Sequence, residues 1–125
     1  MTTPRKKDKA KESKGSLVPE LIKQQIADLE HKLSIDIGSL LVLMAEGTQE
    51  QVVLANQKTK RDLIKFGPDM QKLAEQAGGV LPKVVDEYLN SVDSIVHSAT
   101  GWVDEARVAH CYNVTQKLHK ELGMD

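Results

Sequence analysis

The sequence predicts an all-α protein, either an elongated helical bundle or an antiparallel coiled-coil hairpin of two long helices with one or two short helices between them. Apolar residues recur at spacings of three and four along most of the chain, which is typical of amphipathic helices. Only four of the 125 residues are aromatic, so aliphatic residues and alanine supply nearly all of the apolar mass. Glycine and proline separate the apolar stretches and indicate where helices end.

Residues 1–16 are predicted to form a disordered basic N-terminal arm, and residues 17–125 a single all-helical domain. The arm has six Lys and Arg against two acidic residues, a net charge of +4, whereas the remainder has eleven against sixteen, a net charge of −5. After the initiator, the arm has no aliphatic residue larger than alanine. It therefore lacks the apolar surface that folding requires.

The first helix is predicted to start at Pro19, because the missing N–H of proline has no partner in a first helical turn. It extends to about Ala45 and is interrupted by Asp36, where the apolar pattern calls for a buried residue. Two interpretations of Asp36 remain: a carboxylate that fixes the register of neighbouring helices, or a seam that rotates onto Ile37. The apolar seam consists of Ile22, Ile26, Leu29, Leu33, Leu40 and Leu43.

A second helix is predicted to start after Thr48 and to end at Phe66. Thr48-Gln49-Glu50-Gln51 matches a capping box, in which the side chains of Thr48 and Gln51 each bind the other's backbone amide. Gly67-Pro68 is expected to stop this helix and to start a short one from Pro68 to Ala77. The middle of the second helix, residues 56–62, is polar on every face.

Gly78-Gly79 is predicted to be a hinge, and a long final helix is expected from Pro82 to Leu122. Gly101 lies within this helix, and a mid-helix glycine costs about 1 kcal/mol relative to alanine. Two alternatives remain: one continuous helix, or two helices separated at Thr100-Gly101. We favour the continuous helix because Gly101 falls on its outer face.

An apolar seam with alternating spacings of four and three runs along this final helix and is the predicted partner-binding surface. Alanine at some seam positions lets two helix backbones approach closely. We therefore expect antiparallel packing against the first helix of the same chain or of another chain. A second row at seven-residue intervals runs beside the seam and includes Trp102. The partner-binding residues are Val85, Leu89, Val92, Val96, Ala99, Trp102, Val103 and Ala106.

No pattern in the sequence predicts a catalytic, metal or cofactor site. Cys111 is the only cysteine, so an intramolecular disulfide and a cysteine zinc site are excluded. No Glu-x-x-His pair of the kind found in di-iron bundles is present. The glycines match no phosphate-binding motif. We therefore predict neither an enzyme nor a cofactor-binding protein.

The basic arm is the second candidate site. A cluster of like charges attracts polyanions by counterion release. We therefore predict weak contact of residues 5–14 with nucleic acid or another anionic surface. The polyanion-binding candidates are Arg5, Lys6, Lys7, Lys9 and Lys11.

These observations predict a non-enzymatic helical protein–protein interaction module, a small subunit or adaptor of a larger coiled-coil assembly, acting as a homo- or hetero-oligomer. Two alternatives are a nucleic-acid-associated accessory protein that uses the arm, and a small regulator or inhibitor of one target protein. The longest uncharged apolar run, Ile37 to Ala45, is far shorter than the roughly 20 residues of a membrane span. We therefore expect a cytoplasmic location, with the nucleus as the alternative.

Overall fold

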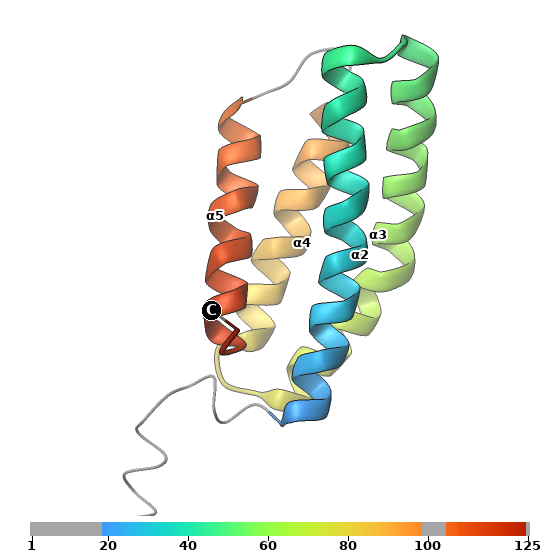
Figure 1. The fold of residues 1–125 in the computed structure, drawn as a ribbon. Coiled ribbons are helices and arrows are strands. Elements are labelled where there is room, and N and C mark those ends of the chain that lie inside the picture. The colour runs from blue at the N-terminus through green and yellow to red at the C-terminus, as the bar shows by residue number, and fades with distance from the viewer. Residues whose placement is uncertain (1–18, 99–104, 125) are drawn as a thin grey trace, which may run out of the picture.

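A computed structural model describes residues 19–98 and 105–124, and this part of the chain is entirely helical apart from short turns. Four helices lie side by side and run alternately up and down (Figure 1). They therefore form an up-and-down helical bundle, the arrangement that short connections between consecutive helices favour. The helices are α2 (Glu20–Glu46), α3 (Gln49–Ala77), α4 (Leu81–Ser98) and α5 (Glu105–Glu121).

The turn between α2 and α3 has the predicted capping chemistry. The Thr48 hydroxyl accepts a hydrogen bond from the Gln51 amide at 3.1 Å, and the Thr48 amide donates to Gln51 Oε1 at 2.9 Å. Helix α2 starts directly after Pro19 and ends at Gly47. The predicted first helix and the capping box are therefore confirmed.

The predicted helix stop at Gly67-Pro68 is wrong, because α3 continues through both residues to Ala77. Proline removes one backbone hydrogen bond from a helix interior. The residues that follow offset this loss by packing, since Met70 and Ala74 are fully buried in the core. Gly67 is also buried, and a Cβ atom at this position would lie 3.7 Å from Leu89 Cδ1 of α4. Tertiary packing thus keeps α3 continuous.

The predicted continuous helix from Pro82 to Leu122 is also wrong. Helix α4 ends at Ser98, and α5 starts at Glu105 and returns antiparallel to α4 (Figure 1). Residues 99–104, which include Thr100 and Gly101, lie outside the described part of the chain. The apolar face of α4 is broad, and the returning α5 covers it with Val114 and Leu118. The two longest helices are consequently α2 and α3, with no short helix between them.

The core runs through the centre of the bundle and receives residues from all four helices. No described helix is long and apolar enough to span a membrane. Fully or almost fully buried core residues include Ile26, Leu33, Leu40, Met70, Val85, Tyr88, Val92, Ile95 and Leu118.

Candidate functional site

The α4 part of the predicted partner-binding seam lies inside the bundle. Val85, Val92 and Val96 of α4 are buried, and Leu89 is half-buried, under helices of the same chain. Of the remaining seam residues, Ala106 is exposed on α5. A partner therefore has no access to the α4 part of the seam while the bundle is closed. Outside the described residues lie Ala99, Trp102, Val103 and the arm candidates Arg5, Lys6, Lys7, Lys9 and Lys11.

An apolar groove of about 240 Å³ lies between α2 and α5. These two helices form its walls, and α4, which lies between and behind them in Figure 1, supplies its floor. The sequence alone did not reveal this groove. Its lining residues are Ser34, Ile37, Gly38 and Leu41 of α2, Tyr88 and Ile95 of α4, and Val108, Cys111, Tyr112 and Thr115 of α5.

Large apolar side chains border the groove and face solvent. Ile35 and Val42 of α2 are 55% and 56% exposed, and Tyr112 of α5 is 63% exposed. Positions 35, 38 and 42 are three and four residues apart, so they are neighbours on one face of α2. The groove and its border thus form one exposed apolar surface, a feature that commonly marks an interaction site.

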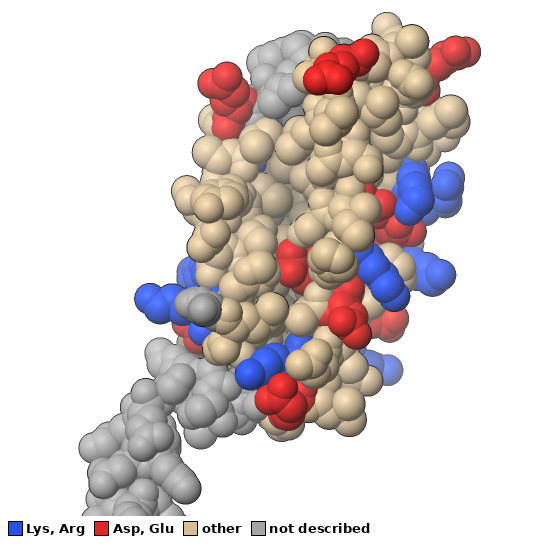
Figure 2. All heavy atoms as spheres, in the orientation of Figure 1, with Lys and Arg blue, Asp and Glu red and all other residues tan. Residues whose placement is uncertain are grey.

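Charged side chains are nearly absent from both walls. Between residues 33 and 45, α2 has one Asp, Glu, Lys or Arg, which is the buried Asp36. Between residues 106 and 116, α5 has only Arg107 of these four types, and its guanidinium donates to the Ser94 carbonyl of α4 at 3.2 Å. Figure 2 accordingly shows uncharged residues over the upper part of the face formed by α5 and α2, with most charged side chains below it and at its edges. Charged residues at the centre of a partner's contact surface would therefore meet no opposite charge on these two walls.

Gly38 leaves an opening in the middle of the α2 wall. A Cβ atom at this position would meet no other atom within 4 Å. Glycine in a helix interior costs about 1 kcal/mol relative to alanine, and no neighbouring atom in the described bundle requires its small size. A large side chain at position 38 would occupy the groove without entering the core.

A polar network closes the lower end of the groove, one helical turn below Ser34. The buried carboxylate of Glu30 binds His119 Nε2 of α5 at 2.8 Å and accepts a hydrogen bond from the Ser34 hydroxyl. The Tyr88 hydroxyl donates to the Glu30 carbonyl at 3.4 Å. Burial raises the pKa of Tyr88, so this hydroxyl remains a donor. Glu30 and His119 therefore join α2 and α5 at the point where the groove ends.

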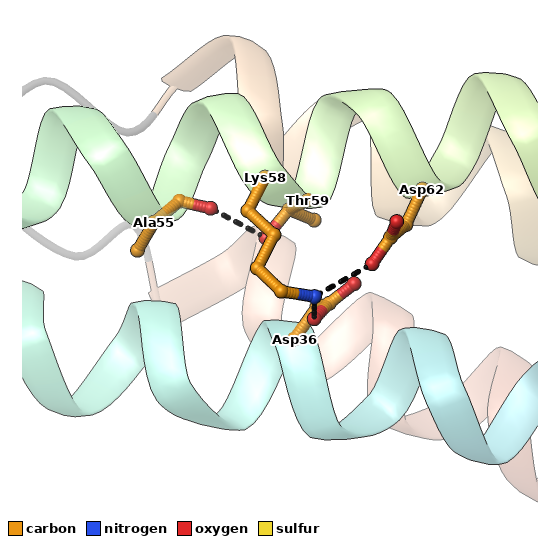
Figure 3. Close-up of polar contacts among 5 residues, drawn as sticks. All are labelled: Asp36, Ala55, Lys58, Thr59 and Asp62. Carbon is orange, nitrogen blue, oxygen red and sulfur yellow. Dashed lines mark hydrogen bonds and ion pairs between the residues drawn. The ribbon is translucent and has the colours of Figure 1, made fainter.

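On the side of α2 that faces α3, an ion pair between the exposed Lys58 and the buried Asp36 links the two helices (Figure 3). Lys58 Nζ lies 3.0 Å from Asp36 Oδ1 and 2.9 Å from Asp62 Oδ2. Asp36 is 6% exposed, and its second oxygen has no hydrogen-bond partner among the described residues. Ile37 is buried as well, in agreement with a seam that rotates onto it. A role of Asp36 in fixing helix register stays a prediction.

Burial is the main reason why the pKa of Asp36 is raised, and the neighbouring Asp62 raises it further while Lys58 opposes the shift. The neighbouring side chains of Asp36 and Lys58 lower the pKa of Asp62. The sequence contained a signal for this contact, since Asp36 and Lys58 are both eleven residues from Gly47 and an antiparallel turn brings such positions together. These three side chains link α2 and α3.

Within residues 19–98 and 105–124, no three His, Cys, Asp or Glu side chains lie close enough to hold a metal ion. Comparison of the chain with protein-family models, curated proteins and solved structures found no match. The predicted absence of catalysis stays a prediction. The surface geometry of the bundle is therefore the basis for a functional proposal.

Proposed function

We propose that this chain is a protein–protein interaction module, a small subunit or adaptor of a larger helical assembly. Its α2–α5 groove binds the apolar face of a helix from a partner. The observation that carries this proposal is an exposed apolar groove whose walls are nearly free of charge over three helical turns. This is the function predicted from the sequence, but we assign its binding surface to the groove instead of the α4 seam.

A helix suits this groove better than a small molecule. The volume of about 240 Å³ is below the roughly 300–1,000 Å³ of typical small-molecule pockets. The antiparallel walls provide the ridges between which a further helix packs. A helix laid along them would insert apolar anchors at spacings of three, four and seven residues. Gly38 gives one such anchor room to approach the α2 backbone.

The test compares the wild-type chain with Gly38→Trp, which fills the groove, and with Gln76→Trp, which adds the same side chain at an exposed position near the C-terminal end of α3. Sedimentation velocity over a range of concentrations detects a second copy as the partner. Tagged chains expressed in the native host detect a different protein. We expect Gly38→Trp to weaken the resulting complex at least about tenfold and Gln76→Trp to leave it unchanged, with equal helicity of all three chains by circular dichroism.

The proposal would be contradicted if the wild-type chain stays monomeric and captures no protein that Gly38→Trp fails to capture. Equal binding by all three chains would also contradict it, because the groove would then contribute nothing to recognition. An enzyme inhibited by the bound chain would support the narrower alternative of a regulator that uses the same groove.

A further inference from the structure

The outward face of α3 combines exposed aliphatic and basic side chains. Leu54 and Ile64 are 65% and 67% exposed, and Lys60, Arg61 and Lys65 are exposed beside them. Arg61 lies seven residues after Leu54, Ile64 and Lys65 lie three and four residues after Arg61, and Lys60 lies four residues before Ile64. The five positions therefore share one broad face of the helix. We call these five residues the basic–apolar face of α3.

The basic charge of this face is not neutralised within the described bundle. Residues 57–65 have four Lys and Arg and one acidic residue, Asp62, which is engaged with Lys58. Lys60 and Arg61 form no ion pair with any residue of the described helices. Residues 17–125 have a net charge of −5, so this cluster of cations is an exception on an acidic body. Figure 2 shows several of the Lys and Arg side chains gathered along the edge of the bundle where α3 lies.

Two further features extend the face. Lys65 Nζ lies 5.5 Å and Lys32 Nζ of α2 lies 5.3 Å from the centre of the Phe66 ring, so the ring places two ammonium groups near each other. Val53 adds a partly exposed aliphatic side chain one turn before Gln57. The face therefore extends over several turns of α3.

We propose that the basic–apolar face of α3 binds an anionic lipid bilayer. Lys and Arg attract anionic headgroups, and exposed Leu and Ile gain free energy by entering the interface between headgroups and acyl chains. The convex surface of a single helix can contact a nearly flat bilayer along its whole length. A nucleic acid would use the cations but would gain little from Leu54 and Ile64, and an exposed aromatic side chain for base stacking is lacking among the five residues of the face.

This surface is separate from the groove. The basic–apolar face lies on α3, whereas α2 and α5 form the groove walls, and α3 lines no part of it. Lipid binding and partner binding can therefore occur together and can fail independently.

The test is cosedimentation of the full chain with vesicles of phosphatidylcholine alone or mixed with phosphatidylglycerol. We expect binding only to the anionic vesicles, with a decrease at high salt because the charges are exposed. The double variant Lys60→Glu/Arg61→Glu should bind at least about tenfold more weakly, since each basic residue near such a surface contributes about fivefold. Ile64→Ser should weaken binding about threefold or more by removing an inserted aliphatic group.

Matched variants separate this face from general charge and from the arm. Lys83→Glu/Lys120→Glu changes the net charge equally on exposed positions of α4 and α5, and Ile35→Ser removes an exposed isoleucine from α2. Both should bind like wild type. The arm is tested in a chain with Arg5, Lys6, Lys7, Lys9 and Lys11 changed to glutamine. In this chain, adding Lys60→Glu/Arg61→Glu should still weaken vesicle binding.

Absence of binding to anionic vesicles would overturn the proposal. Equal loss in the two charge-reversal pairs would overturn it too, because net charge alone would then explain binding. A DNA or RNA oligonucleotide bound through Lys60 and Arg61, without vesicle binding, would replace the lipid with nucleic acid as the occupant.

Discussion

Around residues 34–41, helix α2 has a closed side toward α3 and an open side toward α5. Nearer its N-terminus, a groove of about 400 Å³ with mostly polar lining residues also lies between α2 and α3. On the closed side, Asp36 and Lys58 join the two helices across a packed interface. On the open side, the helices meet through Glu30 and His119 but leave an apolar groove beside Gly38. One amphipathic helix can thus complete its packing in one direction and keep an apolar surface available in the other. Substitutions in the shared core, on the closed side and on the open side should therefore differ in their effect on stability.

The largest effect is expected from the core that both sides share. Leu33 is fully buried, so Leu33→Ala should lower the free energy of unfolding by about 2–5 kcal/mol through lost burial and a remaining cavity. Val42 borders the open groove, so Val42→Ala should change it by less than about 0.5 kcal/mol. Urea unfolding followed by circular dichroism measures both. A large loss in Val42→Ala would show that this part of the α5 side is packed rather than open.

A smaller effect is expected from the ion pair on the closed side. Lys58→Met leaves the buried Asp36 without a cation and should lower the free energy of unfolding at neutral pH by about 1–3 kcal/mol. Lys58 itself is 60% exposed, so water access favours the lower end of this range. Lys58→Arg, which keeps a cation, is the matched control in the same unfolding measurement. Equal stability of Lys58→Met and wild type would mean that Asp36 is already solvated.

The smallest effect is expected from Asp36→Asn, as a change in how the free energy of unfolding depends on pH. The pKa of Asp36 is raised above its ordinary value of 3.8 in the folded bundle, mainly by burial. The folded state therefore holds this proton more tightly than the unfolded state, and ionised Asp36 opposes folding as the pH rises from 3.8 through the raised pKa. The substitution Asp36→Asn removes this contribution, because an amide does not ionise.

Unfolding of both chains across this pH range provides the measurement. The free energy of unfolding of Asp36→Asn minus that of wild type should become more positive as the pH rises. The lowered pKa of Asp62 acts in the opposite direction, since its contribution is lost as the pH falls. A difference that does not change with pH would show that Asp36 has the same pKa in the folded and unfolded states.

The sequence was sufficient for features that depend on local chemistry. The helix start at Pro19, the capping box at Thr48 and the burial of Ile26, Leu33 and Leu40 follow from turn signals and apolar spacing. The burial of Glu30 does not. Pro68 was misinterpreted because Met70 and Ala74 pack into a core formed by other helices, and this packing outweighs the hydrogen bond that proline removes. A Gly-Pro pair in the sequence carries no information about such contacts with other helices.

The candidate site was less predictable than the fold. Apolar spacing showed that the Val85–Val96 part of the seam would be buried against something, but it could not show that α5 of the same chain returns to cover α4. The groove depends on the distance between α2 and α5, which are separated by two other helices in the sequence. The one sequence feature at the position of the groove is Gly38, a glycine within an uncharged apolar run.

The central claim is that the α2–α5 groove, and no other apolar surface of the bundle, contacts a partner protein. The most direct measurement places a photo-crosslinking phenylalanine analogue at Tyr112, in the groove, and for comparison at Leu21, which is 70% exposed and outside it. Irradiation in the native host should give a protein adduct from position 112, mapped by mass spectrometry to an apolar helix face of the partner, and little from position 21. Equal adducts from both positions, or none from position 112, would contradict the account.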